Sequence, residues 1–210
     1  MRPPGTMTTI LMWSLSVLAI VGADRPPVEQ TPFPTMASAQ GRMPCGSCNA
    51  PATIAWQGII APPAEPGERL VISGTVFQPD GTTPAPEITL FLFHTDSRGH
   101  YNSRDDPFDP RLYGWVRTGA DGDYEFRTIR PGPYPELSTP AHIHVHVFGP
   151  GRPEWFVPEY WFAGDPLIPA KDRDLPARLG RFSPIVRLTR DGDGTWRGQR
   201  DIRLDRPSPK

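Results

Sequence analysis

From residue 68 onward the chain alternates short apolar runs with turn signals, and this pattern constrains the fold more than any other feature. The runs are rich in β-branched and aromatic residues, and no window shows a long apolar period of 3.6 residues. Asp-Gly turns in "PDGTTP", "GADGD" and "RDGDGTW" separate them, and "DRDLPARLGRF" has room for a helical turn only. About eight strands are expected, which predicts an all-β domain, either a two-sheet β-sandwich or a barrel. The expected strands are "RLVISGTVFQ", "EITLFLFHT", "YGWVRT", "DYEFRTI", "AHIHVHVFG", "PEYWF", "SPIVRLTR" and "RDIRL".

Length and charge narrow the class of protein further. With 210 residues and no internal repeat, the chain has the size of one ordinary domain. Its 29 prolines and 20 glycines separate apolar runs, while six tryptophans and ten phenylalanines favour a packed core over disorder. The 22 basic and 23 acidic side chains nearly cancel, and no basic stripe is interleaved with aromatic residues. Nucleic-acid binding is therefore not expected, a small or neutral partner is favoured, and the oligomeric state stays open.

The N-terminus has the layout of a secretory signal peptide. Arg2 precedes the apolar run "ILMWSLSVLAIVGA", and polar, proline-rich sequence follows it. We expect a signal peptide over residues 1–23, with cleavage after Ala23 or as late as Ala39. A proline-rich leader would then cover residues 24–67 and the folded domain residues 68–210. A membrane anchor is the alternative, but a spanning helix needs about 20 apolar residues, so a secreted or periplasmic protein, free of the membrane after cleavage, is predicted.

The only cysteines, Cys45 and Cys48, stand in "MPCGSCNAP". A lone C-x-x-C pair is compatible with a redox pair, half of a zinc site or a local disulfide. Outside the cytoplasm a disulfide is favoured, a zinc ribbon would require a second pair, and no βαβ pattern follows. We therefore predict that the two cysteines form a local disulfide.

Three of the five histidines fall in one expected strand, after a tyrosine held between two prolines. Because side chains alternate along a strand, His142, His144 and His146 share one face and the intervening apolar residues face the core. The spacing H-x-H lets two imidazoles reach one metal ion, although a solvated polar face would show the same pattern. In "RPGPYP" the flanking prolines stiffen the backbone around Tyr134 and so fix the direction of its ring.

With these segments in view, the chain resembles the intradiol ring-cleavage dioxygenases, the family of protocatechuate and catechol dioxygenases. The resemblance covers roughly residues 68–205 and rests on "GHYN", "DGDYEFRTIRPGPYP", "PAHIHV", "GDPLI" and, more weakly, "RDIRL". It implies a β-sandwich with a mononuclear, non-haem Fe(III) ion held by two tyrosines and two histidines. It also implies cleavage of a small aromatic diol by O2 between the two hydroxylated carbons. The matching metal-binding and catalytic residues would be Tyr101, Tyr134, His142 and His144.

Three further positions follow from the same resemblance. Family members carry an arginine three residues before the first ligand histidine and a glutamine where Glu159 falls, whereas this chain has Thr139 and Glu159. Tyr160 lies among bulky aromatic residues and is expected, with Thr139 and Glu159, to contact substrate.

Two other residues near the motifs compete for roles at the site. Tyr113 competes with Tyr101 for the upstream ligand role, but the order of the family motifs favours Tyr101. His146 lies about 6.6 Å beyond His144 along the strand, so we expect His146 to be a polar residue one step beyond the site. The other possibilities are that it supports a ligand as a hydrogen-bond donor or is itself an alternative metal ligand.

Three functions remain in competition. The resemblance favours a secreted Fe(III) dioxygenase that acts on catechol-type rings. A non-catalytic β-sandwich binding module that retains the fold is the second possibility. A copper or zinc protein that uses His142, His144 and His146 is the third.

Overall fold

The computed structural model describes Met1 and residues 44–107 and 109–205. The predicted signal peptide, both possible cleavage sites and residues 24–43 of the predicted leader lie outside these residues. Within the described part of the chain, no helix has the length and apolar character needed to cross a membrane.

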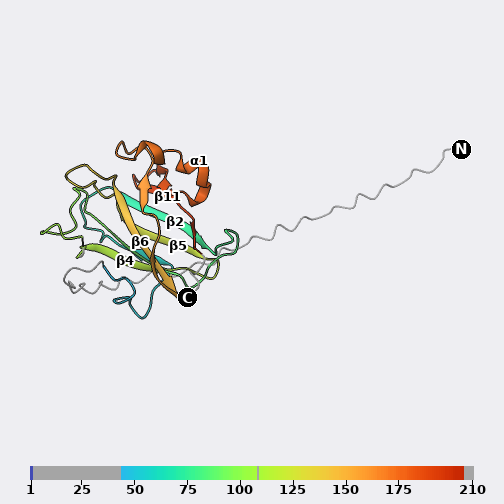
Figure 1. Cartoon of the computed structure of the whole chain (residues 1–210). Coiled ribbons are helices and arrows are strands. Elements are labelled where there is room, and N and C mark those ends of the chain that lie inside the picture. Colours follow the sequence, from blue (N-terminus) through green and yellow to red (C-terminus); the bar gives the residue numbers. More distant parts are fainter. Residues whose placement is uncertain (2–43, 108, 206–210) are drawn as a thin grey trace.

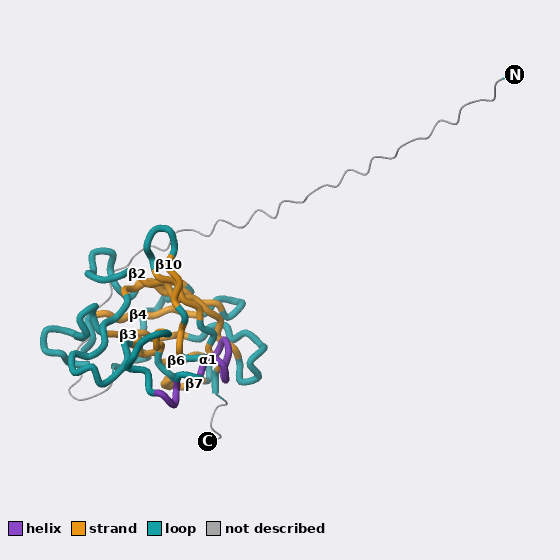
Figure 2. Tube along the Cα trace, turned by 90° about the horizontal axis from the view of Figure 1, so that it is seen from above, coloured by secondary structure: helices purple, strands orange, loops and turns teal. Residues whose placement is uncertain are grey.

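Two mixed β-sheets pack face to face, so the predicted all-β sandwich is confirmed (Figures 1 and 2). The first sheet comprises β1 (Gln57–Ile59), β2 (Arg69–Phe77), β5 (Asp123–Ile129), β10 (Leu188–Arg190), β11 (Trp196–Gln199) and β12 (Ile202–Arg203). The second comprises β3 (Thr89–His94), β4 (Leu112–Arg117), β6 (His142–Gly149), β7 (Arg152–Phe156), β8 (Tyr160–Phe162) and β9 (Ile185–Val186).

The long strands form the centre of each sheet. In the first sheet, β2 and β5 pair in antiparallel fashion; β1 joins β5 in parallel, and β11 and β12 join β2 in parallel. In the second sheet, β3 lies between β4 and β6 with antiparallel pairing on both sides.

The strand prediction differs from the structure at the short strands. Strands β1, β7 and β11 were not expected, and each has only three to five residues. The run "SPIVRLTR", expected as one strand, divides into β9 in the second sheet and β10 in the first. The domain also begins before residue 68, because β1 belongs to the segment assigned to the leader and pairs with β5.

The core lies between the sheets and is built by alternation along the long strands. Leu70 and Ile72 of β2, Leu90 and Leu92 of β3, and Val145 of β6 are all fully buried there. The residues between them on β3 and β6 face the opposite side of the second sheet. A separate aromatic cluster covers that outer face, and it comprises Phe91, Phe93, Tyr101, Tyr113 and Trp115.

The segment before β1 packs over this outer face. Gly46 lies directly against the Phe91 side chain, where an added Cβ atom would come within 2.5 Å of it. The Gly46 carbonyl accepts a 2.9 Å hydrogen bond from Trp115 Nε1. The part of the expected leader around Gly46, Ala50 and Ile54 therefore covers the aromatic cluster.

One short helix, α1 (Leu175–Leu179), stands between the 3₁₀ turns η1 (Ala170–Asp172) and η2 (Gly180–Phe182). Pro176 lies in its first turn, where a missing N–H costs nothing, so the predicted helical turn forms in this segment. Leu175 and Leu179 of α1 line the same cavity as His144 of β6, the strand that carries the histidines.

Candidate metal centre

Strand β6 turns its histidines away from the core. Ile143 and Val145 are buried between the sheets, so His142 and His144 point to the outer face. Phe93 on β3 pairs in register with His144, and the two rings stack with centroids 4.5 Å apart. The outer aromatic cluster thus supports the imidazoles from one side.

Four donor atoms from Tyr101, Tyr134, His142 and His144 form a closed ring. The two tyrosine hydroxyls lie 2.7 Å apart, and the Tyr101 hydroxyl lies 2.7 Å from His144 Nε2. The Tyr134 hydroxyl lies 3.2 Å from His142 Nε2, and the two Nε2 atoms lie 3.1 Å apart. The structure therefore brings together the four residues predicted as ligands.

This ring of donors fits a metal ion. Donors bound at about 2 Å to one ion lie roughly 2.8 to 3.3 Å from each other, close to the spacing of these four atoms. Burial raises the pKa of both tyrosines and, with the neighbouring His144, lowers the pKa of His142. The imidazole is thus kept neutral, as a ligand must be, whereas the phenols need a nearby cation to lose their protons. Two phenol oxygens and two imidazole nitrogens suit a hard, highly charged ion such as Fe(III).

The two tyrosines come from loops that are fastened together. The Gly132 N–H donates to the Asp96 carbonyl at 2.9 Å, and the Thr95 hydroxyl donates to the Gly132 carbonyl at 2.9 Å. Gly99 has a positive φ of 93°, and a Cβ there would lie 2.0 Å from the Pro133 carbonyl oxygen. Only glycine permits this approach, which holds the loop of Tyr101 against the loop of Tyr134.

Each ligand histidine is held through its other ring nitrogen. His142 Nδ1 lies 2.7 Å from the Pro140 carbonyl oxygen, which can only accept a hydrogen bond. His144 Nδ1 lies 2.9 Å from a carboxylate oxygen of Glu159. Both Nδ1 atoms therefore carry the proton, and both Nε2 lone pairs face the tyrosine hydroxyls.

Glu159 is thus better described as the anchor of His144 than as a metal ligand. It belongs, with His142 and His144, to a group whose possible ligand atoms lie within 4.8 Å of one another. Its contact, however, is with Nδ1, on the far side of the ring from the other donors. Hydrogen bonding to His144 holds the pKa of Glu159 at about 2, despite burial that acts to raise it. Glu159 was predicted to contact substrate; in the structure it contacts His144.

Asp165, in the motif "GDPLI", supports the start of β6 and was not among the predicted site residues. One carboxylate oxygen accepts a 2.9 Å hydrogen bond from the Ala141 N–H, next to His142, and the other accepts one from the Leu167 N–H. This side chain ties the loop after β8 to the start of β6. An Asp before proline after a strand was the available signal.

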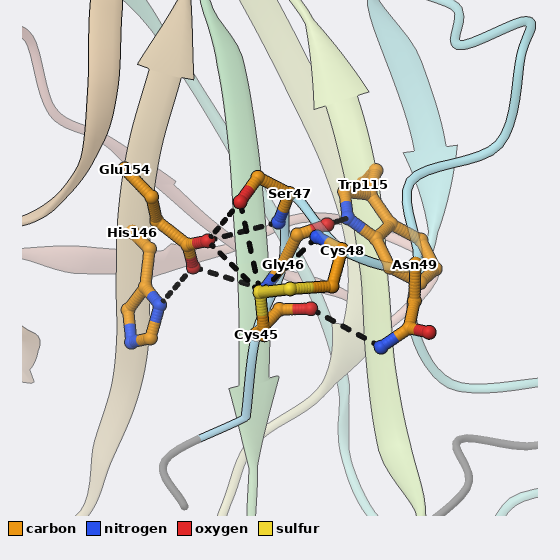
Figure 3. Close-up of a disulfide and its surroundings, with 8 residues drawn as sticks. All are labelled: Cys45, Gly46, Ser47, Cys48, Asn49, Trp115, His146 and Glu154. Atoms are coloured by element: carbon orange, nitrogen blue, oxygen red, sulfur yellow. Dashed lines mark hydrogen bonds and ion pairs between the residues drawn. A yellow bond between two sulfur atoms is a disulfide. The ribbon is translucent and has the colours of Figure 1, made fainter.

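His146 does not join the donor ring. It is buried, and its Nδ1 lies 2.6 Å from Glu154 on β7. As Figure 3 shows, the same carboxylate accepts hydrogen bonds from the N–H groups of Gly46 and Ser47, both at 2.9 Å. Hydrogen bonds from His146 and Ser47 lower the pKa of Glu154 to about 2 against the effect of burial. His146 lies one step beyond the site, as expected, but it is a buried structural residue and not a solvated one.

The loop that holds Glu154 is closed by a disulfide. Cys45 and Cys48 are joined, as predicted, and Cys48 is exposed (Figure 3). The Ser47 hydroxyl adds a third hydrogen bond to Glu154, at 2.6 Å. We call Cys45–Cys48 with Glu154 and His146 the disulfide clamp.

Tyr160, one of the predicted substrate contacts, lies in the core. Tyr160 is fully buried in the core, where its hydroxyl lies 2.8 Å from that of Tyr124. Tyr160 begins β8 and points into the core, whereas Glu159, the residue before the strand, contacts His144 on the outer face. Thr139 lies on the loop before β6 and contacts Ser138, 3.5 Å away. Tyr113, the competing ligand candidate, packs in the outer aromatic cluster.

A cavity of about 540 Å³ begins at His144 and Glu159. Its walls are largely apolar, and they come from the segment around Phe156, from Trp161 and from α1 and η2. The volume lies within the roughly 300–1,000 Å³ range of small-molecule sites. A second hollow, of about 990 Å³, lies along the loop of residues 96–111, but none of the four donor residues lines it. Of these two cavities, only the first is lined by a donor residue, His144.

Comparisons with known proteins agree with this fold. A profile for the dioxygenase family matches residues 59–178, more than half of the chain. The chain is 34% identical to the protocatechuate 3,4-dioxygenase beta chain of Burkholderia cepacia over 113 residues, 49% of this chain and 48% of the relative. It is 37% identical to catechol 1,2-dioxygenase 1 of Acinetobacter lwoffii over 129 residues, 50% of this chain and 40% of the relative. The chain thus spans about half the length of these curated relatives, or less.

Solved structures show the same sandwich. The dioxygenase domain of a dioxygenase carbohydrate-binding protein fusion from Streptomyces sp. SirexAA-E matches with a TM-score of 0.55 and 25% identity, covering 83% of this chain and 99% of that one. Catechol 1,2-dioxygenase from Acinetobacter sp. ADP1 matches with a TM-score of 0.52 and 22% identity, covering 73% of this chain and 62% of that one. With the family profile and the curated relatives, these likenesses show that the chain belongs to the intradiol ring-cleavage dioxygenase family.

Proposed function

We propose that the protein is a mononuclear, non-haem Fe(III) dioxygenase that cleaves catechol-type rings between the two hydroxylated carbons with O2. The observation that carries the proposal is the closed ring of four donor atoms from Tyr101, Tyr134, His142 and His144. Family membership supports the same reaction class. A ferric ion bound there would supply the positive charge that favours ionised phenol oxygens and makes a chelated diol reactive toward O2.

Tyr134 is the donor best placed to give way to substrate. It is only half-buried and lies on the loop before β6, whereas Tyr101 is 3% exposed and packs against Phe93. A phenolate oxygen released from Tyr134 can accept a proton that a catechol hydroxyl gives up. Tyr101, His142 and His144 then hold the site in place while the diol binds.

The remaining residues position the site and keep it partly dry. Glu159 and the Pro140 carbonyl hold the two imidazoles in the tautomer that presents Nε2. The apolar walls of the cavity that begins at His144 limit the access of water to the ring of the substrate. No arginine stands at position 139, where the family resemblance leads one to expect it, so stabilisation of developing charge falls to other groups.

Two measurements on the purified protein test the proposal. Phenolate coordination predicts a red-brown colour from charge transfer between phenolate and ferric ion. Oxygen uptake with catechol should yield a muconate-type diacid without added reductant. A colourless protein shown to be iron-loaded, or an aldehyde product from cleavage beside the diol, would contradict the proposal.

The same measurements separate the competing functions. A non-catalytic binding module would take up no oxygen with catechol whatever its metal content. A copper or zinc protein that uses the three histidines would show that metal in elemental analysis; the contact of His146 with Glu154 supports iron at a two-histidine site instead.

We also propose export with removal of the N-terminal segment. The apolar run at residues 10–23 and the disulfide between Cys45 and Cys48 support an oxidising compartment. N-terminal sequencing of the protein recovered from the medium and the periplasm should begin after Ala23 or Ala39. An intact Met1 in the cytoplasmic fraction alone would contradict it.

A further inference from the structure

We propose that the cavity beside the donor ring selects catechols with a neutral, apolar ring substituent and rejects those with a ring carboxylate. This inference rests on the proposed function and concerns its substrate class. The observation behind it is the combination of apolar walls with two acidic side chains and no lysine or arginine among the described residues that line one cavity. Both features belong to the cavity of about 540 Å³ that His144 and Glu159 line at one end.

Side chains from three elements form the apolar walls. The volume of about 540 Å³ leaves room for a substituent on a single aromatic ring. Phe156 and Leu179 remain 51% and 41% exposed at this cavity, so an apolar group bound between them would cover surface that otherwise faces water. The walls comprise Phe156, Val157, Trp161, Leu175, Leu179 and Phe182.

The charged groups at the cavity are both acidic. Glu159 lies at the end next to His144, and Asp172 lies on η1. Among the described residues that line the cavity there is no lysine or arginine, and Lys171, the neighbour of Asp172, is exposed. A carboxylate on the substrate would therefore face two like charges in apolar surroundings with no cation to pair with.

The nearby arginines are occupied elsewhere. Arg173 Nε donates to the Ile168 carbonyl at 3.1 Å. Arg178 forms an ion pair of 3.2 Å with Asp174, and the Arg181 guanidinium lies 3.4 Å from Asp201. None of these arginines lines the cavity, although the Arg181 guanidinium also lies over the Phe182 ring, 4.9 Å from its centroid.

A matched pair of substrates tests the proposal on the intact, iron-loaded protein. In 4-isopropylcatechol and protocatechuate the substituents have nearly the same shape, but one is apolar and the other is an anion. We expect kcat/KM to be about tenfold or more higher for 4-isopropylcatechol, since a buried carboxylate without a partner loses its hydration. Equal values, or a preference for protocatechuate, would overturn the proposal.

Two variants test the physical cause. Asp172→Asn removes one negative charge at constant shape and should raise kcat/KM for protocatechuate several-fold, with little change for 4-isopropylcatechol. Leu179→Arg supplies a cation at the wall and should narrow the preference further. If neither variant changes the ratio between the two substrates, charge at this cavity does not set specificity.

Binding measured without turnover keeps this proposal separate from the proposed function. Calorimetry with 4-isopropylphenol and 4-hydroxybenzoate, which lack the second hydroxyl, should show tighter binding of the neutral phenol. Should catechol resist cleavage while this preference holds, the function fails and the cavity assignment stands. If catechol is cleaved but 4-hydroxybenzoate binds more tightly, the cavity assignment fails alone.

Discussion

Glu159 holds His144 from the side opposite the donor ring. Its carboxylate oxygen lies 2.9 Å from Nδ1, while Nε2 of the same imidazole lies 2.7 Å from the Tyr101 hydroxyl. A carboxylate in this position fixes the tautomer of a ligand histidine and makes its free nitrogen more basic. In the proposed site, the acidic residue would therefore strengthen His144 as a ligand without itself binding the metal.

Replacing Glu159 should weaken metal binding while leaving the fold intact. Loss of such an anchor typically costs about 10- to 100-fold in metal affinity, and we expect this for Glu159→Ala. Glu159→Gln keeps an oxygen that accepts from Nδ1 and should recover part of the loss. Iron retained during dialysis against graded chelator measures the effect, with Glu136→Gln, an exposed carboxylate on the loop before β6, as the control. Equal iron retention in Glu159→Ala and the control would argue against the anchor.

Tyr134→Phe should remove colour and turnover without unfolding the protein. The phenyl ring keeps its packing beside Tyr101, but the oxygen donor is lost. Tyr160→Phe is the matched control: its hydroxyl bonds to Tyr124 in the core, so we expect a loss of about 1 kcal/mol in the free energy of unfolding and an unchanged spectrum. Visible absorption and denaturant unfolding of both variants check this. A Tyr134→Phe protein that keeps its colour would exclude this residue as a ligand.

The disulfide clamp should contribute to stability and not to metal binding. Joining Cys45 to Cys48 restricts the unfolded chain, which for so short a loop is worth about 2 kcal/mol. The double variant Cys45→Ser/Cys48→Ser should therefore unfold at lower denaturant concentration with iron content unchanged. Adding a reductant should shift wild-type protein in the same direction and leave the double variant unaffected. Loss of iron from the double variant would instead place the clamp in the metal site.

Local patterns in the sequence predicted the long strands and the shared face of the histidines, whereas the family resemblance supplied the two tyrosines of the donor set. Alternation along β6 separates His142 and His144 from Ile143, and this feature needs no knowledge of the rest of the fold. Strands of three to five residues have no such period, and parallel pairing joins segments far apart in the chain, so β1 and β11 were missed.

The supporting residues show the same limit. Glu154 contacts His146, eight residues earlier, because β6 pairs with β7. Its contact with Gly46, 108 residues earlier, forms only when the segment before β1 folds over the second sheet, and no local pattern indicates it. Tyr160 was predicted to contact substrate from its aromatic neighbours in sequence, but its side chain is buried in the core.

His94 should make the protein less stable as the pH falls from 7 to 5. Its ring is fully buried on β3, with Nδ1 2.6 Å from the Thr95 carbonyl oxygen and Nε2 2.6 Å from the Thr128 hydroxyl. Burial lowers the pKa of His94 from 6.5 to about 4. Below pH 6.5 the unfolded chain therefore binds a proton that the folded chain takes up only near pH 4, so the free energy of unfolding decreases across this window.

The change can be measured by comparing wild-type protein with His94→Gln. One proton accounts for about 1.4 kcal/mol per pH unit, so His94 should account for roughly 2 kcal/mol of the stability that wild type loses between pH 6.5 and pH 5. His142, whose pKa is also lowered by burial, and the carboxylates contribute equally to both proteins, which leaves His94 as the source of the difference between them. His94→Gln should be less stable at pH 7, because the ring and its packing are lost, but its stability should depend less on pH. Parallel stability curves for the two proteins would show that the buried imidazole takes up its proton equally in both states.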